Sequence, residues 1–88
     1  MKYKIDVVAT LAERITKVVG NERERNIVLT RLVTVDQLVD PDTRLNERQL
    51  DALSALATEL LRVPRNQESR VERNQLALAT YINASTCR

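Results

Sequence analysis

The sequence lacks histidine and contains one cysteine, Cys87, beside its last residue. A Cys/His zinc cluster needs several such ligands and an internal disulfide needs two cysteines, so both are excluded. Histidine is also the most common general base in enzymes, and it is missing here. The serines lie in no recognisable nucleophile turn; they are Ser54, Ser69 and Ser85. These absences predict a protein that binds a partner and catalyses no reaction, with no metal and no cofactor.

Glycine, proline and aromatic residues are also scarce, with one glycine, two prolines and two tyrosines. Sandwiches and barrels of short strands need many more turn residues, so the sequence excludes them. Since Tyr3 and Tyr81 are the only aromatic residues, aliphatic side chains must fill the core. A content of 43% hydrophobic and 30% charged residues is typical of a folded chain, and 88 residues are enough for a single domain, 1–88.

No apolar run approaches the roughly 18 residues that a membrane span requires. Near the start, Asp6 and Glu13 interrupt the apolar core that a signal peptide would need. A lone cysteine suits a reducing compartment. We therefore expect a cytoplasmic protein that does not bind a membrane.

Three breaks divide the chain into four segments of similar length, at Gly20-Asn21, at Asp40–Thr43 and at Val63-Pro64. Apolar residues recur at helical spacing within each segment, which predicts an all-α fold. We expect a small bundle of about four helices, followed by a frayed tail at 84–88; the helices should span approximately 4–19, 22–39, 47–62 and 67–83.

The start of the first helix is open to two interpretations. A stripe of apolar residues and the position of Gly20, a favoured residue after a helix end, indicate a helix. Residues 3–7 also alternate between apolar and polar side chains, as a strand does. We favour the helix; its apolar stripe consists of Val7, Leu11, Ile15 and Val18.

Asparagines precede the other three helices as candidate N-caps: Asn21, Asn46 and Asn66. In the second helix, the β-branched residues of 27–35 would also suit a strand, but Arg31 and the apolar spacing favour a helix. In the fourth helix, Leu76 and Ala79 are expected to lie away from the inner stripe. The inner stripes are Val28, Leu32, Val35 and Val39 in the second helix, Leu50, Leu53, Ala57, Leu60 and Leu61 in the third, and Val71, Gln75, Leu78 and Ile82 in the fourth.

The second helix is apolar around most of its circumference, and Leu76 adds an apolar residue outside the inner stripe of the fourth. Small proteins rarely leave such surfaces uncovered. We therefore expect a homo-oligomer, with a dimer favoured, or a partner protein that covers the same surface. The candidate residues for self-association are Ile27, Leu29, Val33, Leu38 and Leu76.

The net charge is +2, from 14 basic and 12 acidic residues, and one concentration of arginines stands out between residues 62 and 73. Arginine binds carboxylates and phosphates through a planar fork of donors. The mild net charge and the lack of aromatic residues between the arginines argue against nucleic acid. The candidate partner-binding residues are Arg62, Arg65, Arg70, Arg73, Leu76 and Tyr81.

Residues 45–53 resemble the opening of the LuxR-type helix-turn-helix, in which a capped helix begins with a Leu-Thr-x-Arg-Glu pattern. The resemblance implies DNA binding, but neither a glycine turn nor a recognition helix follows these nine residues. We assign no family on this basis.

The leading hypothesis is a small regulatory or interaction protein, of the adaptor, inhibitor or antirepressor kind found in phages and plasmids. It would bind a partner protein through an apolar helical surface ringed by arginines. One alternative is a DNA-binding transcriptional regulator that uses the basic patch between Arg62 and Arg73. A second alternative is a structural subunit of a larger assembly.

Overall fold

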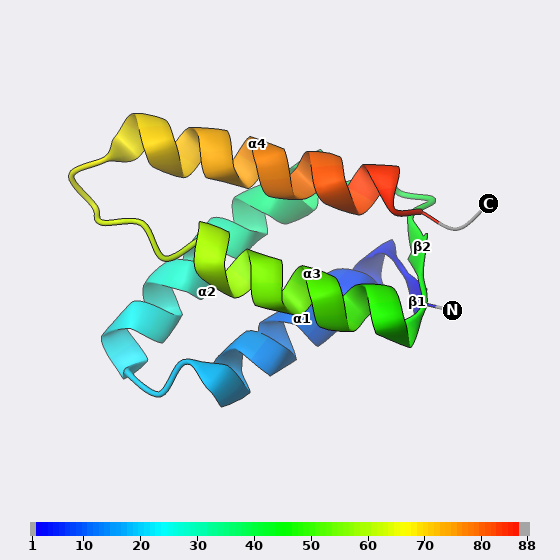
Figure 1. Ribbon diagram of the computed structural model, residues 1–88, viewed down its shortest axis with the longest axis horizontal. Helices are drawn as coiled ribbons and strands as arrows, with labels where there is room; N and C mark the ends of the chain where they lie inside the picture. Colours follow the sequence, from blue (N-terminus) through cyan, green and yellow to red (C-terminus); the bar gives the residue numbers. More distant parts are fainter. Residues whose placement is uncertain (1, 87–88) are drawn as a thin grey trace.

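The computed structural model describes residues 2–86, which form four helices and two very short strands (Figure 1). The predicted all-α bundle is confirmed. The elements are β1 (Lys2–Tyr3), α1 (Lys4–Val18), α2 (Glu22–Leu38), β2 (Arg44–Leu45), α3 (Glu47–Leu60) and α4 (Glu68–Ala84).

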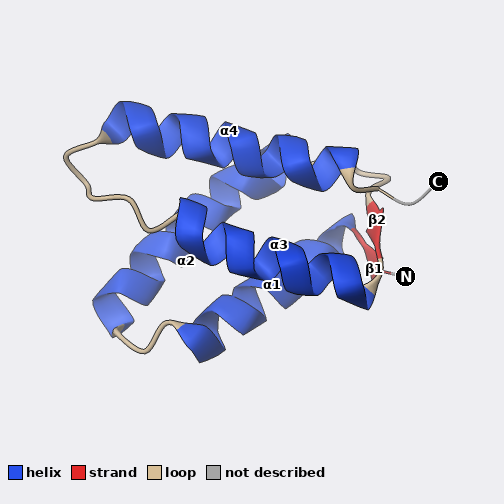
Figure 2. Cartoon of the chain, in the orientation of Figure 1, coloured by secondary structure: helices blue, strands red, loops and turns tan. Residues whose placement is uncertain are grey.

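Each helix packs against two others: α1 lies against α2 and α3, and α4 lies against the same two helices. Successive helices run in opposite directions, so α1 and α3 point the same way, and so do α2 and α4 (Figure 1). The α1–α2 and α3–α4 loops therefore lie at one end of the bundle. The short sheet and the α2–α3 connection lie at the other end (Figure 2).

The core is aliphatic, as the scarcity of aromatic residues predicts. Most residues of the four predicted inner stripes meet in it, and Leu45 of β2 closes one end. The prediction is wrong for Val18, which is 70% exposed; α1 ends there, and the next residue, Val19, is buried in its place. Leu60 and Val71 are only partly buried. Burial of this apolar surface is the dominant favourable term in folding. The core cluster consists of Val7, Leu11, Ile15, Val19, Val28, Leu32, Val35, Val39, Leu45, Leu50, Leu53, Ala57, Leu61, Leu78, Ala79 and Ile82.

Two of the three predicted N-caps are confirmed. The side chain of Asn21 accepts a hydrogen bond from the backbone N–H of Glu24 at 2.9 Å. Asn46 and Gln49 form a reciprocal capping box at the start of α3. At α4 the prediction is wrong, because Gln67 and not Asn66 precedes the helix, and its side chain makes no cap hydrogen bond.

The reason for the different start of α4 is a local turn. The backbone N–H of Gln67 donates to the carbonyl of Pro64 at 3.1 Å, which places Asn66 inside the turn. Asn66 is therefore one residue too early to reach the free amides of the helix.

The two ends of α1 also differ from the predictions. The helix ends at Val18, Val19 occupies the C-cap in an extended conformation, and Gly20 follows without a positive φ angle. At the other end, both interpretations of the N-terminal residues hold in part. Lys2 and Tyr3 pair in antiparallel fashion with Leu45 and Arg44, and the helix begins directly afterwards.

In α4, Ala79 is buried, contrary to the prediction that it lies away from the inner stripe. Gln75 and Asn83, each four positions from Ala79, donate to backbone carbonyls of α2, so Ala79 falls on the side of α4 that faces α2. Ala84 is the last residue of α4 and does not belong to a frayed tail. Cys87, on which the predicted reducing compartment rests, lies outside the described residues.

Among residues 2–86, no helix has both the length and the apolar character that a membrane crossing requires.

Candidate functional site

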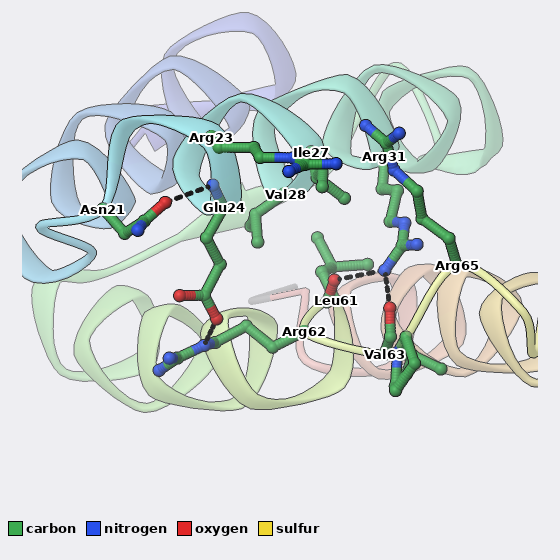
Figure 3. Close-up of a pocket in the computed structure, with 11 residues that line it drawn as sticks. Asn21, Arg23, Glu24, Ile27, Val28, Arg31, Leu61, Arg62, Val63 and Arg65 are labelled. Carbon is green, nitrogen blue, oxygen red and sulfur yellow. Dashed lines mark hydrogen bonds and ion pairs between the residues drawn. The ribbon is translucent and has the colours of Figure 1, made fainter.

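A cleft with a volume of about 370 Å³ opens between the N-terminal half of α2 and the segment that follows α3 (Figure 3). We call it the arginine cleft. It brings together residues that are about 30 to 40 positions apart in the sequence. Its lining residues are Asn21, Arg23, Glu24, Ile27, Val28, Arg31, Leu61, Arg62, Val63, Pro64 and Arg65.

Arg31 connects the two walls of the cleft. Its Nη1 donates hydrogen bonds to the backbone carbonyls of Leu61 at 2.9 Å and Val63 at 2.6 Å (Figure 3). Leu61 caps the end of α3, where helix carbonyls lack helical partners. Arg31 therefore satisfies these carbonyls and holds the α3–α4 loop against α2.

Arg62 and Glu24 form a second connection across the cleft. The Nε of Arg62 lies 2.6 Å from a carboxylate oxygen of Glu24. The side chains are 46% and 38% exposed, so water screens this ion pair and its contribution to stability is small. The pair shows, however, that a carboxylate fits against a guanidinium within the cleft.

The other two arginines of the cleft have no such partner. Within residues 2–86, neither Arg23 nor Arg65 forms an ion pair or a side-chain hydrogen bond. In Figure 3, Arg23 extends along α2 toward Ile27, and Arg65 reaches from the loop toward Arg31. By contrast, Arg14 on α1 is held by two carboxylates of α3, those of Glu47 and Asp51.

The like charges in the cleft affect one another. Burial lowers the pKa of Arg31, and the positive charge of Arg65 lowers it further. Arginine nevertheless stays protonated at neutral pH. An anion placed between these side chains would relieve their repulsion.

A second concave region of about 520 Å³ surrounds the start of α4, and Arg65 lines it as well as the arginine cleft. Here Arg70 and Arg73 join Arg65, and the side chain of Arg70 donates to Gln67 at 3.3 Å. The structure thus brings Arg62 and Arg65 together on one side of the α3–α4 loop and places Arg70 and Arg73 on the other, with Arg65 shared between both sides.

The remaining candidate residues for partner binding are exposed but do not share a face. Leu76 is 59% exposed and Tyr81 is 54% exposed. The two lie five positions apart on α4, which corresponds to about 140° around the helix axis. They therefore belong to different surfaces, and neither lines the arginine cleft.

The candidate residues for self-association are also spread out. Ile27 lines the arginine cleft, and Leu29 packs against the core while remaining partly exposed. Val33, Leu38 and Leu76 are exposed. Val33 and Leu38 are about 140° apart on α2, so a contact with one flat surface could not cover both.

Sequence reasoning missed Arg23 and Arg31, which complete the cleft from α2. A signal was present, because Arg31 is a charged residue within the apolar segment 27–35. In such a segment, a charged side chain is expected at the edge of the core, near a partner. Which partner it meets depends on how α2 packs against the α3–α4 loop.

Comparisons with protein-family models, with curated proteins and with solved structures gave no match. The chemistry of the cleft is therefore the basis for the functional proposal. Within the described part of the chain, no group of three or more His, Cys, Asp or Glu side chains is placed to hold a metal ion.

Proposed function

We propose that this chain is a non-enzymatic interaction protein, of the adaptor or inhibitor kind, that binds a partner protein through the arginine cleft. One observation carries the proposal: Arg23 and Arg65 stand in a cleft without a carboxylate partner among residues 2–86. Aliphatic side chains lie beside them, including Ile27. Arginines next to apolar residues are typical of the energetically important centres of protein interfaces.

Binding would act sterically, by occupying a surface of the partner. The predicted cytoplasmic location and a homo-oligomeric state, with a dimer favoured, remain part of this proposal. Self-association would use one of the exposed apolar positions Val33, Leu38 or Leu76, since Val33 and Leu38 lie on different sides of α2.

The test is a tagged pull-down from the source cell at moderate salt, with and without nuclease. The wild type is compared with the double variant Arg23→Gln/Arg65→Gln. We expect a stoichiometric protein that survives nuclease and is lost with the double variant. The matched control is Lys17→Gln/Arg48→Gln, which removes two exposed charges of α1 and α3 that do not line the cleft.

A captured protein that the double variant retains would show that the cleft is not the binding surface. Nucleic acid captured in place of a protein, and lost at higher salt, would favour the alternative of a DNA-binding regulator. That alternative would use Arg65, Arg70 and Arg73, which surround the start of α4.

A further inference from the structure

The ion pair in the arginine cleft indicates which anion the cleft accepts. The carboxylate of Glu24 binds the Nε of Arg62 at 2.6 Å. The backbone of Glu24 is fixed by the hydrogen bond from its N–H to Asn21, so its side chain starts from a defined position at the cleft edge. Glu24 thus occupies one arginine of the cleft and leaves Arg23 and Arg65 available.

The apolar side of the cleft narrows the choice of ligand. The apolar surface open to a ligand comes from the partly buried Ile27 on the α2 wall and the exposed Pro64 on the loop wall, whereas Val28 and Val63 are buried. An acidic peptide can place a carboxylate on an arginine and an apolar side chain on this surface at the same time. A nucleic-acid backbone offers only phosphates and sugars, so it would leave this apolar surface uncovered.

The overall charge favours the same ligand. Tight binding to nucleic acid depends on many phosphate contacts and on a strongly positive surface. This chain carries a net charge of only +2. A short acidic segment of a protein needs only a few forked contacts, which suits a small cleft.

We propose that the arginine cleft binds an acidic segment of a partner protein, with its carboxylates on Arg23 and Arg65 and an adjacent apolar side chain on Ile27. In this arrangement, Glu24 competes with the incoming carboxylates for Arg62. The inference rests on the proposed function and specifies the chemistry of the partner.

The competition by Glu24 has a measurable consequence. Its charge neutralises Arg62 and repels other carboxylates in the same cleft. A Glu24→Gln substitution keeps the size of the side chain, removes this charge and leaves Arg62 without its ion pair. Acidic ligands should therefore bind more tightly to the variant than to the wild type.

The experiment is a fluorescence-anisotropy titration of the full chain with a short labelled peptide in which aspartate and leucine alternate. The control probes are the same peptide with asparagine in place of aspartate, and a random-sequence DNA duplex. We expect the aspartate peptide to bind and the asparagine peptide not to bind. Arg23→Gln and Arg65→Gln should each weaken binding about threefold, and both together about tenfold, as expected for partly exposed charge pairs.

Glu24→Gln should tighten binding of the aspartate peptide about threefold, whereas Glu59→Gln, an exposed glutamate of α3 outside the cleft, should leave it unchanged. Circular dichroism establishes that each variant keeps its helical content. Equal binding of the aspartate and asparagine peptides, or binding of neither, would overturn the inference. So would weaker binding to Glu24→Gln.

These outcomes can be separated from failure of the proposed function. If the aspartate peptide does not bind but the pull-down still captures a protein that depends on Arg23 and Arg65, the cleft binds a partner by other chemistry. If the DNA duplex binds more tightly than the aspartate peptide, with a steep loss at higher salt, both proposals are wrong.

Discussion

Arg31 provides the sharpest test of how the bundle holds its α3–α4 loop. Replacing it with methionine keeps an unbranched apolar stem but removes the guanidinium that donates to Leu61 and Val63. The backbone carbonyl of Arg31, which accepts a hydrogen bond from Gln75 at 3.2 Å, is unaffected by the change. The substitution therefore removes two hydrogen bonds and leaves the contact between α2 and α4 in place.

A hydrogen bond to a charged group contributes about 1.5–3 kcal/mol to stability. Because the cleft is open to solvent, water can form hydrogen bonds with the two carbonyls and offset part of the loss. We expect Arg31→Met to lower the free energy of unfolding by about 2–3 kcal/mol. For a domain of this size, that corresponds to a fall in Tm of about 10 °C or more.

Urea denaturation followed by circular dichroism measures the change. Arg31→Lys should recover about half of the loss, since an ammonium group can donate to one carbonyl but lacks the planar fork. Arg48→Gln, an exposed arginine of α3, should change the free energy by less than about 0.5 kcal/mol. Hydrogen exchange at residues 61–67 should also become faster in Arg31→Met. A loss below about 0.5 kcal/mol, with unchanged exchange, would refute the reasoning.

Three further substitutions test the core, a cap and the surface. Leu53 is 5% exposed, so Leu53→Ala should lower the free energy of unfolding by about 2–5 kcal/mol in urea denaturation. A change under about 0.5 kcal/mol would show that α3 does not belong to the core. Asn46→Ala should cost about 1 kcal/mol in the same assay, because it abolishes the capping box with Gln49. Leu76→Glu should reduce the oligomer mass measured by light scattering while helicity is kept; unchanged mass would make Leu76 simply an exposed leucine.

The helices and the core were predictable because each depends on a local pattern. Asn21 and Asn46 cap α2 and α3 through bonds to residues three positions ahead, so their effect is visible in a short stretch of sequence. The buried stripes recur at helical spacing. Asn66 shows the limit of this reasoning, because the turn at Pro64 and Gln67 decides where the helix begins.

Two features depend on distant parts of the chain and could not be predicted. The strand at residues 2–3 contains too few residues for a periodic signal, and it forms because Arg44 and Leu45 lie beside it. The burial of Ala79 follows from the approach of α4 to α2. In both cases the deciding contact joins segments about 40 or more residues apart. The local sequence is compatible with a strand or a helix at residues 2–3, and with a buried or an exposed Ala79.

The candidate site was predictable only in half. Arg62 and Arg65 could be predicted as part of one basic site because they are close together in the sequence. Arg23 and Arg31 are separated from them by a whole helix, and they reach the same cleft because α2 lies beside the loop. The Glu24–Arg62 pair was likewise hidden, since no spacing rule relates residues 38 positions apart.

The described ends of the chain, at residues 2 and 86, lie at the same end of the bundle as the β1–β2 pair (Figure 1). The arginine cleft lies toward the opposite end, near the α1–α2 and α3–α4 loops. A tag, a fluorophore or a second domain attached at either end would therefore leave from the side remote from the cleft. In a fusion or on a sensor surface, immobilisation through either terminus should orient the cleft toward solvent, where a partner can reach it.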